Sequence, residues 1–541
     1  MRRRHATLLA LLLLPGAATR AADVLTVPGD HATIQAAIDA AADGDEIRVA
    51  AGTWFENVVI TGKDVTLRAV DGAAATVMDG GGADSVVTIL NGPGAGCVVD
   101  GFTIRNGGGR DNDGGRWGGG VYIELASPTL RNCVFRDCTA AGGNGGGVFA
   151  AQGDPVIDDC EFLDNQAFEG GGFACEQSDF LIRGCTFRGN TSLAAGGAAG
   201  VWRSPGRIED SVADDNASPT GGGISLRWSS TTVVDGVTVR GNEASSGGGF
   251  DIYRSAPRVV DCVIEDNVAS DRGGGLFLQY AGEARIERCI VRRNAANDSG
   301  GGGIYAIDGG GWSAVNTLLH DNTARSSSGA GVSLSSDIGS LVNCTVARND
   351  AGRPAGGAGI WLSGGSALRL VNCTLWGNTV RGALHDPPGP VHSHTQIDAD
   401  HDSGVEPTHC NYGYDSPVAP PPGGGGNFGR NPLFRDAAGG DFRLLGISPN
   451  IDSGTSLAPG VPDTDLDGRA RPQDGDGDGT AAVDIGAFEH LHGEAPVHAY
   501  VTRDGRPIGA AVAVEPVALG VGQVLALRLV NGGAGPLALT G

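Results

Sequence analysis

The sequence is poor in aromatic residues and almost without lysine. Phe, Trp and Tyr make up 5% of the 541 residues, which disfavours a thick globular core. Lys63 is the only lysine, and 62 acidic against 38 basic side chains give a formal net charge of -24. That balance makes nucleic acid a poor partner. The 93 glycines lack the strict third-position period of collagen, which excludes a triple helix.

Long hydrophobic runs are also missing, apart from one at the start of the chain. Arg2, Arg3 and Arg4 precede the apolar run 6–14, and small residues follow it up to Ala22. This order predicts a secretory signal over residues 1–22 and a secreted or cell-surface protein. A short membrane anchor is the alternative, although the run is shorter than the ~20 apolar residues that a span needs. We expect no transmembrane span in the mature chain.

A repeat fills the middle of the chain. Its pattern is Cys-x-apolar-x-x-Asn, a loop, and then Gly-Gly-Gly-apolar-x-apolar, with one unit about every 26 residues. The repeated asparagines are Asn165, Asn190, Asn216, Asn242, Asn267, Asn294, Asn322, Asn349 and Asn378. Short alternating runs between glycines are typical of strands, and units this small must stack to bury an apolar face. The pattern predicts an all-β, right-handed parallel solenoid in which the asparagines adopt the left-handed turn conformation and bond to one another as a ladder.

Seven cysteines occupy one further position of the repeat. They are Cys133, Cys160, Cys185, Cys262, Cys289, Cys344 and Cys373. Ser211, Val237 and Thr317 stand at that position in other units, so it accepts any small side chain. We expect buried free thiols there, with disulfides as the alternative in an exported protein.

The repeats resemble known families. The steps "FLDN", "FRGN" and "LWGN", alternating with "GGGI"-like steps, are similar to the repeats of polymorphic outer-membrane proteins and of the pectin-lyase-like β-helix superfamily. The opening "TIQAAIDAAADGDEIRVAAGTWFENVVI" resembles the start of many such β-helices. The resemblance covers residues 25 to 490 and implies a right-handed parallel β-helix. It leaves the activity open, because this fold includes lyases, hydrolases, esterases, adhesins and inert scaffolds.

The two ends of the solenoid require caps. An apolar stripe through Ile34, Ala37, Ile38 and Ala41 predicts a capping helix that Gly44 stops, within residues 23–95 that hold the cap and the first coils. Regular repeats are expected over 96–380, a His-, Pro- and Gly-rich loop insertion over 381–430, and a C-terminal β-helix module with an Asp-rich loop over 431–490. That module resembles the choice-of-anchor Q type. Residues 491–541 resemble part of an immunoglobulin-like domain.

Two copies of a D-x-D-x-D-G pattern lie in the C-terminal module. Their carboxylates belong to Asp463, Asp465, Asp467, Asp474, Asp476 and Asp478. Alternate carboxylates can converge on a hard cation, so the pattern predicts a calcium site. An acidic solvated turn is the alternative, because neither copy has the bidentate Glu of an EF-hand.

A column of large side chains follows the glycine clusters. Counted from each cluster, the second position should point to solvent. The predicted ligand-binding residues of this column are Tyr122, Phe149, Trp202, Asp251, Phe277, Tyr305 and Trp361. Exposed aromatic rings in a row would form a platform for a polysaccharide or cell-surface glycan. The alternative is that loops between the coils cover them.

Function is therefore predicted at the level of class. We expect an exported surface or extracellular β-helix that acts in attachment or glycan binding without catalysis, since no coil is enriched in catalytic residue types. The alternative is a polysaccharide lyase or related enzyme, for which Glu176, Arg227, Asp251, Tyr253 and Arg254 in the middle of the solenoid would supply the reactive groups.

Overall fold

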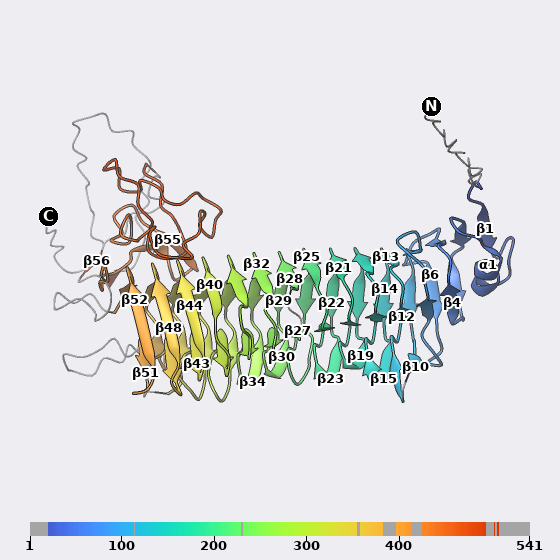
Figure 1. Cartoon of the computed structure of the whole chain (residues 1–541), viewed down its shortest axis with the longest axis horizontal. Helices are drawn as coiled ribbons and strands as arrows, with labels where there is room; N and C mark the ends of the chain where they lie inside the picture. Colours follow the sequence, from blue (N-terminus) through green and yellow to red (C-terminus); the bar gives the residue numbers. More distant parts are fainter. Residues whose placement is uncertain are drawn as a thin grey trace, which may run out of the picture.

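The computed structural model describes residues 20–112, 114–228, 231–353, 357–381, 396–413 and 425–493, together with the short strands β56 (Thr502–Arg503) and β57 (Arg506–Pro507). Its main body is a long solenoid of stacked coils (Figure 1). Most of the predicted signal segment and of the immunoglobulin-like segment lies outside the described residues.

Each regular coil adds one strand to each of three parallel sheets. In one coil, β20 (Phe173–Glu176) belongs to sheet C, β21 (Phe180–Arg183) to sheet A and β22 (Thr186–Arg188) to sheet B. A fourth strand, β23 (Thr191–Ala195), belongs to a short outer sheet. Sheets A, B and C contain 15, 14 and 13 strands. The predicted all-β parallel solenoid is confirmed.

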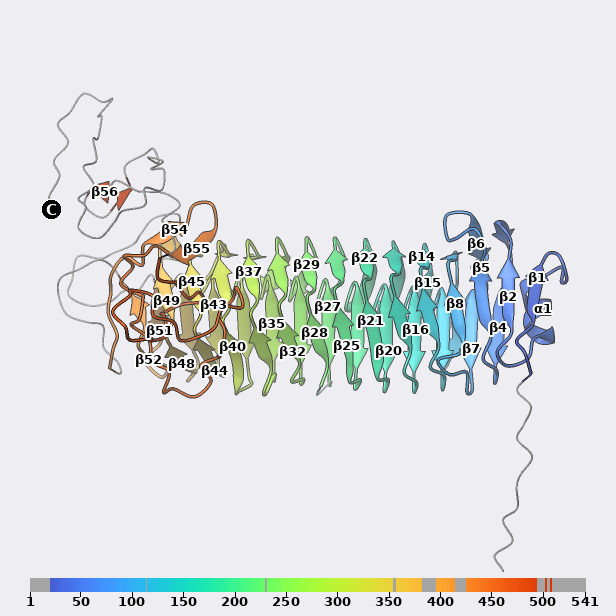
Figure 2. The same ribbon diagram turned by 90° about the horizontal axis from the view of Figure 1, so that it is seen from above.

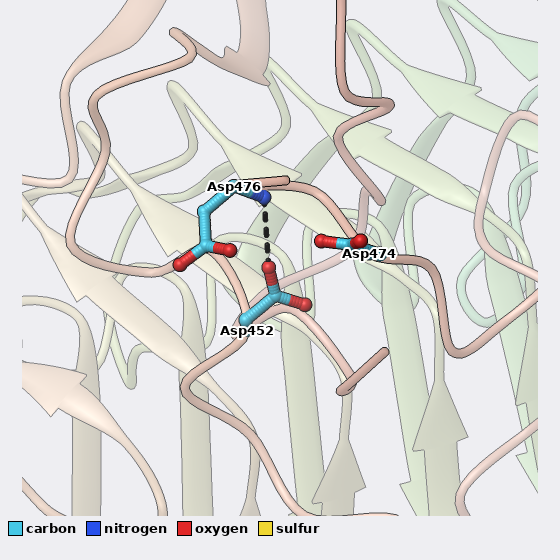
Figure 3. Close-up of side chains that lie close together, drawn as sticks. All are labelled: Asp452, Asp474 and Asp476. Atoms are coloured by element: carbon cyan, nitrogen blue, oxygen red, sulfur yellow. Dashed lines mark hydrogen bonds between the residues drawn. The ribbon is translucent and has the colours of Figure 1, made fainter. Parts of the chain in front are cut away.

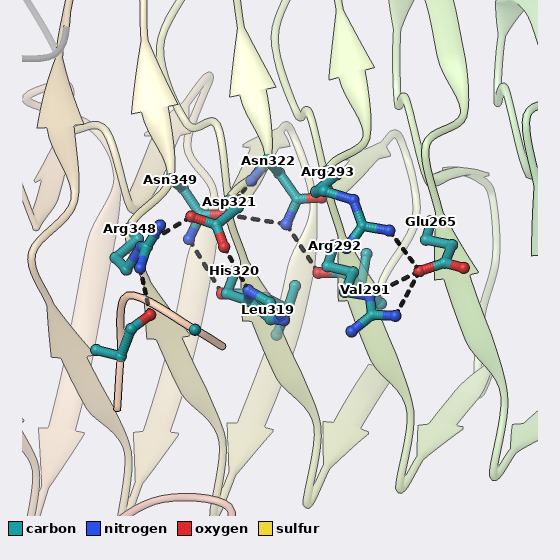
Figure 4. Close-up of polar contacts among 12 residues, drawn as sticks. Glu265, Val291, Arg292, Arg293, Leu319, His320, Asp321, Asn322, Arg348 and Asn349 are labelled. Carbon is teal, nitrogen blue, oxygen red and sulfur yellow. Dashed lines mark hydrogen bonds and ion pairs between the residues drawn. The ribbon is translucent and has the colours of Figure 1, made fainter. Parts of the chain in front are cut away.

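The predicted asparagine ladder is present. All nine side chains are buried. Asn322 donates from Nδ2 to Asn349 Oδ1 at 2.9 Å and to the Val291 carbonyl at 2.9 Å, and Asn349 continues the pattern to the Leu319 carbonyl (Figure 4). After Asn378 the amide of Gln396 extends the ladder by one step. One stacked amide per coil therefore runs along most of the core.

The backbone conformation of the ladder differs from the prediction. The left-handed residue is the one before each asparagine, such as Asp266 with φ 56° and Asp321 with φ 54°, and not the asparagine itself. The left-handed residue changes the direction of the chain, so that the asparagine side chain is buried in the core while the preceding side chain, such as that of Asp266, points outward. The column of cysteines behaves as predicted, because all eleven cysteines of the chain are buried and free.

The capping helix is α1 (Ile34–Ala40), with Ile34, Ala37 and Ile38 buried against the first coil. Thr33 caps its start by accepting a hydrogen bond from the Ala36 amide at 3.1 Å. The single lysine caps its end, because Lys63 Nζ donates to the carbonyls of Ile38 and Ala41, both at 2.8 Å. Gly44 does not stop the helix, which ends at Ala40 and leaves through an extended Ala41.

Part of the predicted loop insertion is a coil. The strands β51 (Ile397–Ala399), β52 (Gly404–Thr408) and β53 (Asn411–Tyr412) end sheets C, A and B. Val405 and Tyr412 pack into the main core. The remaining parts of the proline-rich stretch, 382–395 and 414–424, lie outside the described residues.

Residues 431–490 do not continue the solenoid. The prediction of a β-helix module over these residues is therefore wrong. They hold an antiparallel hairpin of β54 (Phe434–Asp436) and β55 (Asp441–Leu444), and irregular chain that lies along the side of the last coils (Figures 1 and 2). Three corner asparagines hold this lateral module by donating to its carbonyls: Asn316 to Thr464, Asn343 to Asp484 and Asn372 to Thr455. The three asparagines stand at the same corner of three successive coils, so they form one row of contacts along the docking surface.

Candidate functional site

The predicted outward column is buried. Tyr122 and Phe149 are each 2% exposed, Asp251 is 1%, Phe277 is 6% and Tyr305 is 8%. Sheet-C strands such as β16 (Val148–Ala151) do turn this position away from the main core, but a second layer covers it. The exposed aromatic platform predicted from these residues is therefore wrong, and the alternative of covered side chains is correct.

The covering layer is the short outer sheets. The first glycine of each cluster has a left-handed backbone, for example Gly145 with φ 72°, and lets the chain double back tightly. The preceding strand then lies over the outer face of sheet C. Trp117 of β11 (Gly115–Trp117) contacts Phe149 edge to face at 4.7 Å, and Arg272 of β34 (Val268–Arg272) lies 5.5 Å from the ring centroid of Tyr305.

Trp202 and Trp361 keep partial exposure, and Trp202 does so because its register differs from the one predicted. It ends β24 (Ala199–Trp202) and pairs with Glu176 and Arg227, so it stands at the fourth position of the strand. The predicted register was wrong because the glycine cluster is irregular here and reads "GGAAG". The side chains at this fourth position and at the following corner are those that reach solvent.

Three aromatic side chains and one arginine form a surface cluster at the turns that follow successive strands of sheet C. We call this cluster the corner patch, and its members are Trp228, Tyr253, Arg254 and Tyr280. These residues come from β27 (Ile224–Arg227), β31 (Phe250–Tyr253) and β35 (Leu276–Gln279) and the turns that follow them. The exposed fractions of Trp228 and Tyr280 are 44% and 41%.

The corner patch is a stack of rings around one guanidinium group. Arg254 Cζ lies 4.6 Å from the ring centroid of Trp228 and 5.1 Å from that of Tyr280. Tyr253 contacts both rings edge to face, at 5.6 and 6.0 Å between centroids. Cation–π contacts of this kind fix the orientation of the rings. The patch is thus an ordered, amphipathic surface about three coils long.

A cleft of about 170 Å³ adjoins the patch. Its lining residues are Asn144, Glu169, Glu176, Trp202, Arg203 and Trp228. Glu169 ends β19 (Gln166–Glu169) in the outer layer, and Asn144 donates to its carboxylate at 3.4 Å. Burial raises the pKa of Glu169 to about 7, against the lowering effect of Arg227. The cleft therefore holds a carboxyl group that changes charge near neutral pH.

The floor beside the cleft is a fixed ion pair. Arg227 Nε donates to Asp251 Oδ2 at 2.9 Å and to Ser225 Oγ at 3.0 Å, and Ser225 also donates to Asp251. The structure thus brings together Arg227, Asp251, Tyr253 and Arg254 of the predicted enzyme set, with Glu176 in the adjoining cleft. Asp251 is covered and its charge is already matched by Arg227.

Glu169, Trp228 and Tyr280 were missed from the sequence. The signal that could have found Trp228 and Tyr280 is their distance from the glycine cluster, as in "GGGISLRW" and "GGGLFLQY", where the ring follows the last glycine by five residues. Nothing comparable marks Glu169, because its place depends on how the outer layer folds over sheet C.

The aspartate-rich segment forms a different cluster from the one predicted. Asp474 and Asp476 meet Asp452, with carboxylate oxygens within 4.8 Å of one another (Figure 3). Asp465 is buried and accepts the amides of Arg469 and Glu489, while Asp467 pairs with Arg443 at 2.6 Å. Asp463 and Asp478 take no part in the cluster. Calcium stays a prediction, now centred on Asp452, Asp474 and Asp476.

Removing calcium should lower the melting temperature if the cluster binds it. Binding to the folded state alone stabilises by about 2.7 kcal/mol when free calcium is about 100 times Kd. Thermal melts with and without chelator should therefore differ for the wild type and coincide for the double variant Asp474→Ala with Asp476→Ala. Asp463→Ala, an exposed aspartate outside the cluster, should keep the wild-type response. Identical melts of the wild type with and without chelator would contradict the prediction.

The similarity of this chain to proteins of known structure is a similarity of fold. Among solved structures, pectate lyase Pel9A is 14% identical with a TM-score of 0.35, over 88% of this chain and 98% of its own. The alginate lyase AlyF-OU02 is 13% identical with a TM-score of 0.36, over 71% of this chain and 93% of its own. The A-module of the mannuronan C-5 epimerase AlgE6 of Azotobacter vinelandii is 15% identical with a TM-score of 0.31, over 66% of this chain and 95% of its own.

No curated protein matched the sequence. Within the described part of the chain, no helix is both long enough and apolar enough to cross a membrane. The family model "right handed beta helix region" matches residues 47–218, 119–316 and 296–411 in overlapping sections. These matches span more than half of the sequence, and they agree with the stacked parallel sheets. The chain therefore belongs to the right-handed β-helix family.

Proposed function

We propose that this protein is an exported or cell-surface β-helix that binds an extended glycan through the corner patch and does not cleave it. The observation that carries the proposal is the exposed stack of Trp228, Arg254 and Tyr280 on three successive coils. Aromatic faces pack against the apolar faces of sugar rings, and neighbouring polar groups bind the hydroxyls. The resemblance of residues 431–490 to choice-of-anchor modules supports a surface location.

The backbone supports a functional reason for these side chains. Trp228, Arg254 and Tyr280 have φ values of 55°, 47° and 50°. This left-handed conformation costs a bulky residue about 1–2 kcal/mol, whereas glycine and asparagine adopt it readily. Trp228 and Tyr280 are 44% and 41% exposed at these positions, so burial returns less free energy there than it does for a core ring. Large exposed rings at such positions fit a surface that contacts a partner.

The corner patch gives a prediction that separates binding from folding. The double variant Trp228→Asn with Tyr280→Asn should lose about 25-fold in affinity, since each ring contact contributes about 1 kcal/mol. Its melting temperature should stay the same or rise, because asparagine suits the left-handed turn. Retention of the purified protein on immobilised polysaccharides measures the first effect, and a thermal melt measures the second.

Phe55→Ala is the matched control, because Phe55 is an aromatic residue 75% exposed and far along the chain from the patch. It should bind as the wild type does. Unchanged retention of the double variant on every polysaccharide that the wild type binds would overturn the proposed site.

A polysaccharide lyase or related enzyme is the second candidate. The observation in its favour is Glu169, whose pKa of about 7 lets it donate or accept a proton at neutral pH, in one cleft with Glu176. The same polysaccharides, incubated with the protein and scored for unsaturated or reducing ends, decide between the two. New ends that disappear with Glu169→Gln would establish the enzyme.

A further inference from the structure

The cleft beside the corner patch has its own chemistry. Glu169 and Glu176 line this space together with Trp202 and Trp228, and Arg203, which is exposed, also lines it. Arg227, whose charge lowers the pKa of Glu169, is already paired with Asp251 at 2.9 Å. With both glutamates ionised, the cleft therefore carries two negative charges against the one positive charge of Arg203.

The protein gives the ionised carboxylate of Glu169 little stabilisation by hydrogen bonds. Its carboxylate is half-buried and receives one long hydrogen bond, 3.4 Å from Asn144. Burial is the largest influence on its pKa, and Glu176 raises it further. A carboxylate held in this way gains from a cation or from a strong donor that a ligand brings.

We infer that the cleft is a subsite for the protonated amine of an amino sugar, and that the glycan held by the corner patch is a de-N-acetylated amino-sugar polymer. This inference rests on the proposed function. The ammonium group would lie between the indole faces of Trp202 and Trp228 and donate to Glu169 and Glu176. Indole rings attract cations through their faces, and carboxylates supply the counter-charge.

The charge of the whole molecule agrees with this ligand class. A net charge of -24, with one lysine in 541 residues, attracts a polycation over long range and repels a polyanion. A uronic-acid polymer would bring its carboxylates to a cleft that holds two of its own. An N-acetylated polymer would offer Glu169 an amide donor without charge.

Binding of glucosamine oligomers, by calorimetry near neutral pH, tests the inference directly. The fully N-acetylated oligomer and an oligouronate of equal length are the comparison ligands. We expect the wild type to bind the glucosamine oligomer about tenfold more tightly than the acetylated one, which corresponds to about 1.4 kcal/mol. Glu169→Gln and Glu176→Gln should each remove most of that preference and leave the affinity for the acetylated oligomer unchanged.

Glu124→Gln is the matched control. Glu124 stands at the same strand position as Glu176, two coils earlier and outside the cleft. It should keep the wild-type preference. A glucosamine oligomer with trimethylated amines keeps its charge at every pH, so its affinity for the wild type should rise from about pH 6 to about pH 8 as Glu169 ionises. The Glu169→Gln variant should show no such rise.

The outcomes separate this inference from the proposed function. If oligosaccharides bind through Trp228 and Tyr280 but the amine brings no advantage, the amino-sugar subsite is overturned while glycan binding stands. If no oligosaccharide binds, both fail. An oligolysine of equal charge that binds as tightly, with the same dependence on Glu169, would overturn the subsite in favour of a basic peptide.

Discussion

Replacing Asn267 by leucine should lower the free energy of unfolding by about 3 to 5 kcal/mol, because several buried polar groups lose their partners together. Asn267 Oδ1 accepts from both the main-chain and the side-chain nitrogen of Asn242, at 3.0 and 2.9 Å. Its Nδ2 donates to the Val239 carbonyl and to Asn294 Oδ1. Leucine has a similar volume, so the loss would measure the hydrogen bonds and not a cavity.

Denaturant unfolding of the two proteins measures this difference. Gln177→Leu is the matched control, because Gln177 is an exposed amide with one side-chain contact of 3.5 Å, to Gln152, and it should change stability little. The Asn267→Leu variant should also exchange amide hydrogens faster in the coils on either side of residue 267. A loss below about 1 kcal/mol would show that the ladder contributes little beyond the packing around it.

The solenoid itself could be predicted because stacking repeats one constraint in every coil. Each unit contributes one buried amide and one buried small residue at fixed spacing, so nine asparagines and seven cysteines report the same geometry. An error in one unit does not affect the others. That redundancy also explains why the last coil, where Gln396 replaces asparagine and a proline-rich stretch intervenes, was taken for a loop.

The site could not be predicted in the same way. Strand alternation places Phe277 and Tyr305 correctly on the outer face of sheet C, but it does not show that a second strand folds over that face. Which side chains reach solvent depends on the depth of this outer layer. Likewise, the partner of Asp474 is Asp452, more than twenty residues away, and the partner of Asp467 is Arg443. Local motifs do not contain such long-range contacts.

Arg471→Met should loosen the lateral module from the side of the solenoid. The side chain of Arg471 is fully buried and pairs with the equally buried Glu489 at 2.9 Å. It also donates to the carbonyls of Asp484 and Gly486, at 3.1 and 2.9 Å. Removing one partner of a buried pair costs about 3–5 kcal/mol, since the other charge is left uncompensated.

The loss should be local to the module. Residues 431–490 contact the solenoid at points such as Asn372, whose carbonyl accepts the Gly486 amide at 2.8 Å. Limited proteolysis and hydrogen exchange should therefore show faster cleavage and exchange within 431–490 and unchanged protection in earlier coils. Arg430→Met, which changes an arginine just before the module, is the matched control and should leave the module protected. Equal loss of protection along the whole solenoid would contradict a local role.

The same buried group makes the stability of the module fall as the pH rises from about 4 to about 8. Burial raises the pKa of Asp484 to about 8 and that of Glu489 to about 7, with one arginine to balance them. Because the folded pKa values lie above the unfolded ones, the folded module favours the protonated acids. The stability that these two acids contribute is fully present below about pH 4 and is lost as the pH rises towards about 8. Asp484→Asn, which mimics the protonated acid, should flatten this dependence. Protection of residues 431–490 that increases with pH in the wild type would show instead that the carboxylates are stabilised as anions, with Arg471 outweighing their burial.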